Sequence, residues 1–364
     1  MFGSSSKRQI FTRVNDEIIL IHQDSLTSSS NFNSCNCYLV KISDKDYVVI
    51  DPGCSRSKLN KTLRKFGIDY SNLKYVYITH GHSDHVVMLN YIQEKNPTVE
   101  SFMHGLDREY VENPTAYIST LFDVTYMENN EKYKDFVDAI NYYMTQDSTI
   151  QVKDSFKMVF DTWDLRERKI DHTFKDGDVL PGNLKVILAP GHTPGMCLFY
   201  KEQGEILFSA DIHLSSVGAN YNGTTANLHD FKNSINTIIK MVDNNIVKTI
   251  LSGHGKNPII GDLNGRLSDF YNSIVEKENQ ILAMLQDKDG MTIEDITEET
   301  YKIYMKRFDR YLDAGHMQEY FQETIIIAEA SELISNLNVL KELERLNKVK
   351  KFSSELGEKW ILNK

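Results

Sequence analysis

Cysteine is scarce in this 364-residue chain: Cys35, Cys37, Cys54 and Cys197 are the only four. They are too few and too scattered for a disulfide framework. The chain also lacks an apolar run near the ~18 residues needed to span a bilayer, and its first residues lack the apolar segment of a secretory signal. We therefore expect a cytoplasmic protein with no membrane partner.

Basic residues are in deficit as well, since 41 Lys and Arg stand against 51 Asp and Glu, a formal net charge of -10. Non-specific affinity for nucleic acid comes mainly from clustered Lys and Arg. The charge balance therefore disfavours a nucleic-acid partner without excluding one. The length exceeds the usual size of a single domain, which predicts a large domain of roughly 200 to 260 residues and a smaller module.

Periodicity indicates an α/β fold built in two halves. In the first half we expect strands over 18–21, 37–50, 73–79 and 99–103, with helices over 57–66 and 86–95. In the second half we expect strands over 184–188, 197–200, 206–209 and 249–251, with a helix over 228–242. Two such halves predict two stacked sheets with helices on the outside.

Two segments depart from this alternation. Residues of about 105–172 become helical and rich in Tyr and Phe, which indicates either a helical insertion that packs its own aromatics or a lid over a pocket. From about residue 266 the composition turns to Glu, Lys, Leu and Ile with helical spacing, including a helix over 317–347. The end at 343–362 reads as a helix that runs into a two-stranded wing. We predict domains over 1–265 and 266–364, the second resembling a winged helix that serves packing more than nucleic-acid contact.

The stretch Tyr77-Ile78-Thr79-His80-Gly81-His82-Ser83-Asp84-His85 is a strand that runs into a loop with four potential metal ligands. In extended backbone, His80 and His82 lie on the same face and can reach one metal ion. The following turn directs Asp84 and His85 toward a second ion. Imidazole and carboxylate are the ligands expected for zinc, iron or manganese.

Three later loops repeat the pattern of a strand followed by a ligand. They hold His192 in Ala189-Pro190-Gly191-His192-Thr193-Pro194-Gly195, Asp211 after Ile206–Ala210, and His254 in Ser252-Gly253-His254-Gly255. The pair Cys35 and Cys37 could bind a metal or act in redox chemistry, but without a second pair we favour small core residues.

Asp51, the His-x-His-x-Asp-His block at 80–85, His192, Asp211 and His254 together resemble the five ordered motifs of the metallo-β-lactamase superfamily. The resemblance spans about residues 15–260 and implies an αββα sandwich. The tail resembles the winged-helix extension of β-lactamase-like hydrolases related to lactamase-beta-2. Many relatives have Gly-Gly where this chain has Val86-Val87, and the 105–172 insertion is longer than in simple members.

The resemblance also implies roles for these residues. His80, His82 and His192 would bind a first divalent ion, while Asp84, His85 and His254 would bind a second and Asp211 would bridge them. Asp51 would orient ligands without binding metal. Two ions, with zinc preferred and iron or manganese as alternatives, lower the pKa of a bridging water and produce hydroxide near neutral pH. Asp84 would shuttle the proton to the leaving group.

Three reactions fit such a centre. Our leading hypothesis is hydrolysis of a small ester or thioester, in the manner of glyoxalase II-like members, with the aromatic insertion forming part of an acyl pocket. Cleavage of single-stranded RNA by the same site and a mono-iron sulfur dioxygenase are the alternatives. The remaining alternative is a binding module without enzymatic activity. Whether the chain forms a homo-oligomer is left open.

Overall fold

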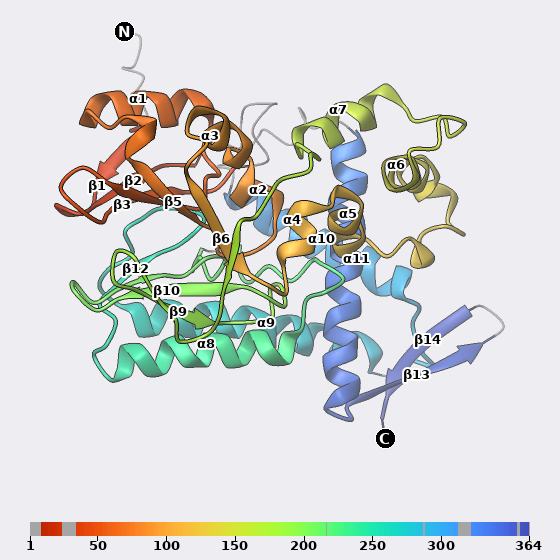
Figure 1. Cartoon of the computed structure of the whole chain (residues 1–364). Helices are drawn as coiled ribbons and strands as arrows, with labels where there is room; N and C mark the ends of the chain where they lie inside the picture. Colours follow the sequence, from red (N-terminus) through yellow and green to blue (C-terminus); the bar gives the residue numbers. More distant parts are fainter. Residues whose placement is uncertain are drawn as a thin grey trace, which may run out of the picture.

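Two β-sheets stack face to face, with helices covering the outer face of each (Figure 1). The computed structural model describes residues 9–23, 34–215, 217–286, 288–311, 322–354 and 357–363. Within them the predicted α/β sandwich is confirmed. None of the helices in these ranges is long and apolar enough to cross a membrane.

The first sheet has seven strands in sequence order. They are β1 (Phe11–Arg13), β2 (Ile18–Ile21), β3 (Cys37–Lys41), β4 (Tyr47–Ile50), β5 (Leu73–Tyr77), β6 (Glu100–His104) and β7 (His172–Phe174). Strands β1 to β4 pair antiparallel, whereas β4 to β7 pair parallel. Its outer side is covered by α1 (Arg56–Phe66), the short α2 (Ser83–Val86) and α3 (Leu89–Lys95).

The second sheet has the order β12-β11-β10-β9-β8. Its strands are β8 (Val179–Leu180), β9 (Leu184–Leu188), β10 (Cys197–Lys201), β11 (Ile206–Phe208) and β12 (Thr249–Leu251). Only the β11–β12 pair is parallel. On its outer side lie α8 (Leu228–Asp243) and α9 (Leu263–Leu285).

Alternating apolar side chains explain why the sheets stack. In β2, Ile18 and Leu20 face the second sheet, while Ile19 and Ile21 face the covering helices. All four are buried, and each such burial stabilises the fold by roughly 1.5–3 kcal/mol. The sandwich therefore holds the ends of the strands, where the candidate ligands lie, in a fixed frame.

The segment between β6 and β7 is a helical insertion, as predicted. It contains α4 (Arg108–Glu112), α5 (Pro114–Leu121), α6 (Lys134–Thr145) and α7 (Asp154–Thr162), with 3-10 turns at Val124–Tyr126 and Glu131–Tyr133. Phe136 packs against Phe122, Phe156 and Phe160, and Trp163 stacks on Phe122 and packs at a tilt against Phe160. These aromatics form a core of their own that joins the core beneath the second sheet.

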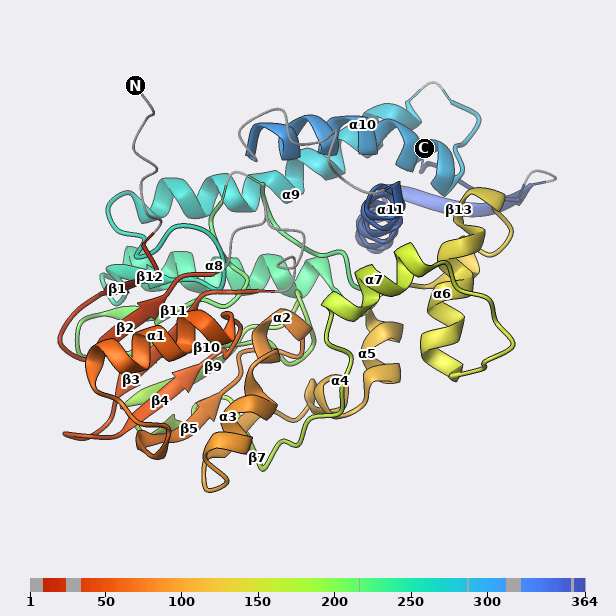
Figure 2. The same ribbon diagram turned by 90° about the horizontal axis from the view of Figure 1, so that it is seen from above.

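After α9 the chain forms α10 (Ile293–Tyr311), α11 (Gln322–Arg345) and a hairpin of β13 (Val349–Ser354) with β14 (Gly357–Leu362). Figure 2 shows α11 end-on between the insertion and α9–α10. Buried glutamates of α11 pair with lysines of its neighbours: Glu329 with Lys132 of the insertion, Glu332 with Lys277 of α9, and Glu342 with Lys232 of α8. The division at residue 265/266 stays a prediction, and 317–321 of the helix predicted over 317–347 lie outside the described residues.

Three details of the predicted elements were wrong. The run expected as one strand over 37–50 is two antiparallel strands, β3 and β4. The single helix expected over 86–95 is divided into α2 and α3, because the N–H of Met88 bonds to the carbonyl of Pro52 at the division. The short strands β1, β7 and β8 were not foreseen, since two or three residues carry too little periodicity.

Candidate metal centre

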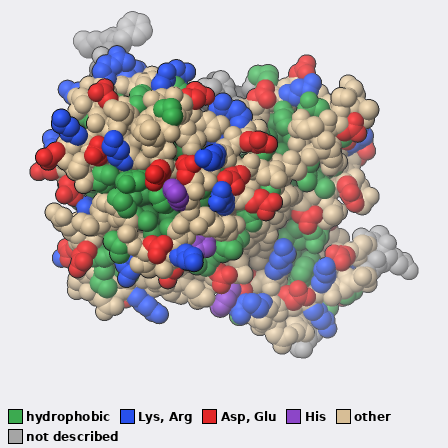
Figure 3. All heavy atoms as spheres, viewed as in Figure 1, with side chains coloured by type: hydrophobic (Ala, Val, Ile, Leu, Met, Phe, Trp, Pro, Cys, Tyr) green, Lys and Arg blue, Asp and Glu red, His purple; other side chains and the backbone are tan. Residues whose placement is uncertain are grey.

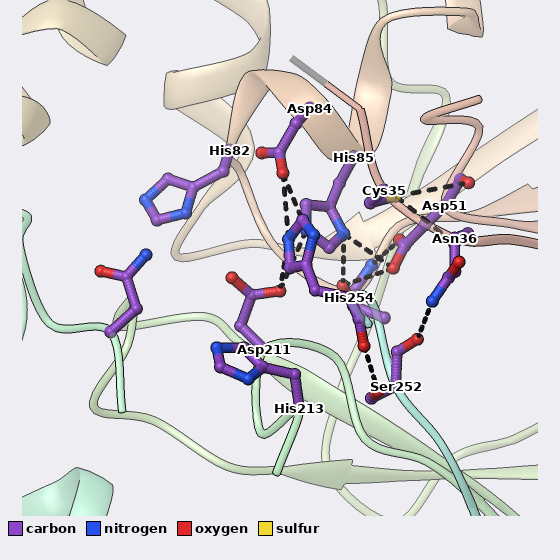
Figure 4. Close-up of polar contacts among 12 residues, drawn as sticks. Cys35, Asn36, Asp51, His82, Asp84, His85, Asp211, His213, Ser252 and His254 are labelled. Atoms are coloured by element: carbon purple, nitrogen blue, oxygen red, sulfur yellow. Dashed lines mark hydrogen bonds and ion pairs between the residues drawn. The ribbon is translucent and has the colours of Figure 1, made fainter. Parts of the chain in front are cut away.

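The seven predicted ligands converge on one place from four loops. His80, His82, Asp84 and His85 follow β5, His192 follows β9, Asp211 follows β11 and His254 follows β12. Figure 4 shows Asp84, His85, Asp211 and His254 directed toward one another. The ligand atoms of His80, His82, His192 and Asp211 form one group within 4.8 Å, and those of Asp84, His85 and His254 form another.

The first group is built around three ring nitrogens. Nε2 of His80 lies 3.0 Å from Nδ1 of His82 and 3.2 Å from Nε2 of His192. Nδ1 of His82 and Nε2 of His192 are 2.9 Å apart. Burial lowers the pKa of His82 to about 3, helped by the neighbouring His192. Burial and the nearby His85 likewise lower the pKa of His80. These rings are therefore neutral, the form that binds metal.

Hydrogen bonds on the outer side of the rings determine the tautomers. Nδ1 of His80 lies 3.0 Å from Oγ1 of Thr79, which itself donates to Asp51, so Nδ1 must be the donor. Nδ1 of His192 donates to the carbonyl of Asn220 at 2.8 Å. Nε2 of each ring then presents a lone pair toward the centre, and two such lone pairs 3.2 Å apart are an arrangement that a shared cation would stabilise.

The second group combines two imidazoles with carboxylates. Nε2 of His254 is 3.1 Å from Oδ2 of Asp84. Nδ1 of His254 donates to Oε1 of Gln23 at 3.0 Å. Burial by itself lowers the pKa of His254, but Asp211 and Asp84 raise it above its ordinary value. The carboxylates thus favour any cation here, whether a proton or a metal ion.

Asp211 lies between the groups and presents one oxygen to each. Its Oδ2 is 3.1 Å from Nε2 of His192, and its Oδ1 is 3.1 Å from Nε2 of His85. Oδ1 of Asp211 and Nε2 of His85 are buried and have no hydrogen-bond partner among the described residues. Two such buried atoms facing each other are what a bound divalent ion would satisfy, so the residues present fit a binuclear centre.

Asp51 bonds to the candidate ligand His85 and to Thr79, and its role in orienting ligands stays a prediction. Its Oδ2 accepts from Nδ1 of His85 at 2.9 Å and from Oγ1 of Thr79 at 2.8 Å, and its Oδ1 accepts from the N–H of Thr79 at 2.8 Å. Asp51 and Ala210, which precedes Asp211, both adopt a left-handed backbone with φ of 48°. Such strain in residues other than glycine is typical of functional sites.

Asp107 was not predicted, yet it links two of the loops that carry candidate ligands. Its fully buried carboxylate accepts from the N–H of Gly81 at 3.0 Å, the N–H of Gly195 at 2.6 Å and Oγ1 of Thr193 at 2.5 Å. Burial raises the pKa of Asp107 although these hydrogen bonds oppose the rise. Asp107 follows β6 by three residues, and Asp51 follows β4 directly. An aspartate shortly after the end of a strand was therefore the signal that could have indicated Asp107.

Gly191, the residue before His192, is required by close packing. It has φ of 126°, and a Cβ there would lie 2.2 Å from the backbone nitrogen of Phe231 in α8. Only glycine tolerates both conditions. The first turn of α8 therefore fixes the entry of the chain into His192.

The centre opens into a cavity of about 340 Å³. His82, Asp84, Asp211 and His254 line it, and the C-terminal helices add Lys277 and Gln280 of α9, Thr300 and Ile303 of α10, and Glu332 and Ser335 of α11. Among the described residues, none of 105–172 lines it. The expectation that the aromatic insertion walls the pocket was wrong in this respect: Tyr117 donates to Ser83 and lies edge-on to the ring of His82, but it does not line the cavity.

The remaining histidines and the cysteines take lesser places. His213 is buried beside His254, with ring centroids 6.1 Å apart, and it lines the cavity. His104 accepts the N–H of Leu106 and belongs to neither group of candidate ligands. Cys35 and Cys37 are fully buried, as expected of small core residues, although Cys35 lies within 4.8 Å of ligand atoms of Asp51 and His85.

A two-sheet α/β sandwich with a His/Asp cluster at the strand ends defines the class of metal-dependent hydrolases. Residues 30–254 match the sequence profile of the Metallo-beta-lactamase superfamily, and the chain belongs to this family as a metallo-hydrolase.

Two curated relatives match parts of this chain. A hydroxyacylglutathione hydrolase of Haemophilus influenzae is 24% identical over 238 residues, 65% of this chain and 93% of that protein. A beta-lactamase-like protein 2 homolog of Caenorhabditis elegans is 29% identical over 120 residues, 32% of this chain and 37% of that protein.

Solved structures show that the fold extends beyond the matched region. A metallo-beta-lactamase family protein of Thermus thermophilus superposes with a TM-score of 0.64 at 17% identity, covering 96% of this chain and 100% of that chain. A beta-lactamase domain protein of Burkholderia ambifaria gives 0.64 at 17% identity, with 97% and 94% covered. The insertion and C-terminal helices therefore belong to an architecture that these proteins share.

Proposed function

We propose that this metallo-hydrolase holds two divalent ions, with zinc preferred, and cleaves a small polar ester or thioester. One observation carries the proposal. Nδ1 of His80, His85, His192 and His254 is engaged on the outer side of each ring, so all four Nε2 atoms face the centre. Such outer hydrogen bonds are how proteins orient histidines that bind metal.

Residues of this chain have distinct tasks in the reaction. His80, His82 and His192 would hold one ion, Asp84, His85 and His254 the other, with Asp211 shared. Two ions so placed lower the pKa of a water molecule and polarise the carbonyl under attack. Asp84 is the more accessible carboxylate, with its side chain 20% exposed against 4% for Asp211, and it lines the cavity. We assign to Asp84 the transfer of a proton to the leaving group.

The cavity supports a small and polar substrate. Its lining beyond the ligands is rich in hydroxyl, amide and charged groups, including Ser273, Gln280 and Lys277. On the face in Figure 3, Lys and Arg side chains are interspersed with Asp and Glu, an arrangement that gives little attraction to a polyanion such as RNA. The relative that hydrolyses hydroxyacylglutathione supports a thioester.

We also propose that α10, α11 and the β13–β14 hairpin form a winged-helix-like module that works inside the enzyme. Thr300, Ile303, Glu332 and Ser335 of α10 and α11 line the substrate cavity. A module that contributes side chains to the cavity acts on a small substrate rather than on a separate nucleic acid.

The test is turnover of a panel of thioesters and oxygen esters by protein reconstituted with zinc. The panel pairs acyl-glutathione and acyl-CoA with esters of the same acyl group on an uncharged thiol or alcohol. We expect hydrolysis of the polar thioesters that is lost in His80→Ala and kept in His229→Ala, a change at an exposed site on α8. Three outcomes would contradict the proposal. They are no turnover of any ester or thioester in the panel, cleavage of RNA by the same preparation, and one iron per chain together with oxygen uptake on a persulfide.

A further inference from the structure

The carbonyl that orients His192 lies in a loop with no regular structure. Asn220 accepts from Nδ1 of His192 at 2.8 Å, and residues 219–223 belong to the connection between β11 and α8. A carbonyl in an irregular loop keeps its direction only when neighbouring peptide groups are held. Another part of the chain must therefore hold the peptide groups next to Asn220.

Asn338 of α11 does so from more than a hundred residues away. Its Nδ2 donates to the carbonyl of Tyr221 at 2.9 Å and to that of Gly223 at 2.8 Å. The next residue, Thr224, is held from the other side, since its N–H bonds to the carbonyl of Thr120 in α5 at 2.7 Å. The loop is thus fixed between the insertion and the C-terminal helix.

The burial of Asn338 argues that this contact has a purpose. The residue is 3% exposed, and its Oδ1 has no hydrogen-bond partner among the described residues. An unsatisfied buried oxygen costs about 1–3 kcal/mol, so a leucine of similar volume would stabilise a purely structural position better. What asparagine supplies, and leucine does not, is the pair of donors to the loop.

We propose that Asn338 is a positioning residue for the first metal ion, acting through the loop and His192. By fixing Tyr221 and Gly223, it keeps the carbonyl of Asn220 where His192 donates to it, and Nε2 of His192 then points at His80 and His82. The C-terminal helix is therefore part of the metal site although it provides no ligand. The inference rests on the proposed metal centre but not on the proposed substrate.

Asn336 offers a matched control on the same helix. It is also fully buried, its Nδ2 also donates twice, to Oγ1 of Thr297 and Oγ1 of Thr300 in α10, and its Oδ1 also has no partner among the described residues. Neither of its bonds reaches a loop that carries a metal ligand. Loss of Asn336 should therefore disturb packing to a similar extent without disturbing His192.

The experiment measures zinc affinity by chelator competition, and the absorption spectrum of the cobalt-substituted protein, in Asn338→Leu and Asn336→Leu. In Asn338→Leu we expect one of two ions to bind roughly 10- to 100-fold more weakly, as for other residues that orient a ligand, with a changed cobalt spectrum. Asn336→Leu should bind both ions like wild type. Asn338→Ser, which keeps one donor, should fall between the two and serves if Asn338→Leu does not fold.

Equal metal affinity in wild type and both Asn338 variants, or an equal loss in the Asn338 and Asn336 variants, would overturn the proposal. Activity is not the readout. A wild-type protein that binds two ions but hydrolyses no ester would contradict the proposed substrate and leave this comparison unchanged.

Discussion

Asp51 holds His85 by a hydrogen bond of 2.9 Å from Nδ1, between side chains that are 3% and 0% exposed. Because the carboxylate accepts only, it fixes a proton on Nδ1 of His85 and leaves Nε2, which faces Asp211, as the atom that could bind a metal ion. The same carboxylate also accepts from Thr79, whose hydroxyl accepts from His80. One buried aspartate thus determines the tautomers of a ligand in each group.

Asp51→Asn should therefore weaken metal binding with little change in shape. The new amide places a donor against either His85 or the N–H of Thr79, and the first case moves the proton of His85 to Nε2, where it blocks the metal. We expect a loss of roughly 10- to 100-fold in affinity for at least one ion, measured by chelator competition. Asp262→Asn, at the N-cap of α9 where Asn caps as well as Asp, should bind metal like wild type.

The link between loops made by Asp107 predicts a combined loss of stability and metal. Asp107→Asn turns one acceptor into a donor opposite Gly81, Gly195 or Thr193, which leaves a buried N–H unsatisfied at a cost of about 1–3 kcal/mol. Urea unfolding should show this destabilisation, and elemental analysis should show less than the wild-type metal content.

Asp171→Asn is the matched control for Asp107. Oδ2 of Asp171 accepts from the N–H and the hydroxyl of Ser101, away from the metal loops. It should lower stability while the metal content stays at the wild-type level. If Asp107→Asn kept its full metal content despite an equal loss of stability, the role of Asp107 in the centre would be refuted.

The convergence of the candidate ligands was predictable because their signal is local. His80 to His85 lie within six residues after a strand, and His192, Asp211 and His254 each follow a strand in the same way. The two stacked sheets followed from the same alternation of strands and helices. Short edge strands such as β8, with two residues, carried no such signal.

Unlike Asp51, the supporting residues Asn338 and Asp107 were not predicted, because their partners lie far away in the sequence. Asn338 contacts Tyr221 across 117 positions, and Asp107 contacts Gly195 across 88. Nothing near either residue in the sequence indicates the partner. The residues that line the cavity were also predicted wrongly, because contacts between distant parts of the chain decide them. The aromatics of 105–172 suggested a pocket wall, whereas α9, α10 and α11 line the cavity beside the centre.

Removal of metal should destabilise the whole fold. Without a cation, the lone pairs of His80 and His192 face each other at 3.2 Å, and Asp211 Oδ1 stays unsatisfied. An ion present at 100 times its dissociation constant stabilises the folded state by roughly 2.7 kcal/mol. We expect the Tm of chelator-treated protein to rise with added zinc in a concentration-dependent way. A Tm that does not respond to zinc, cobalt or manganese would show that the cluster binds none of them.

The pair of Lys277 and Glu332 predicts how the cavity selects its substrate. Both line the cavity, with side chains 12% and 5% exposed, and they form an ion pair. Lys277→Met leaves Glu332 buried without this partner, which should destabilise the fold by roughly 3–5 kcal/mol and should make the cavity more negative. A polar substrate with a carboxylate should then show a raised KM with kcat largely kept.

Lys232→Met separates this effect from general destabilisation. Lys232 pairs with Glu278, with side chains 12% and 6% exposed, and also with Glu342, and none of these three residues lines the cavity. The variant should lose comparable stability, seen in urea unfolding, while KM stays at the wild-type value. The two variants remove the same charge at equal burial. An equal rise of KM in both variants would therefore contradict a specific role of Lys277 in the cavity. If the KM for an uncharged ester rose as much in Lys277→Met as the KM for the charged substrate, charge would be excluded as the cause.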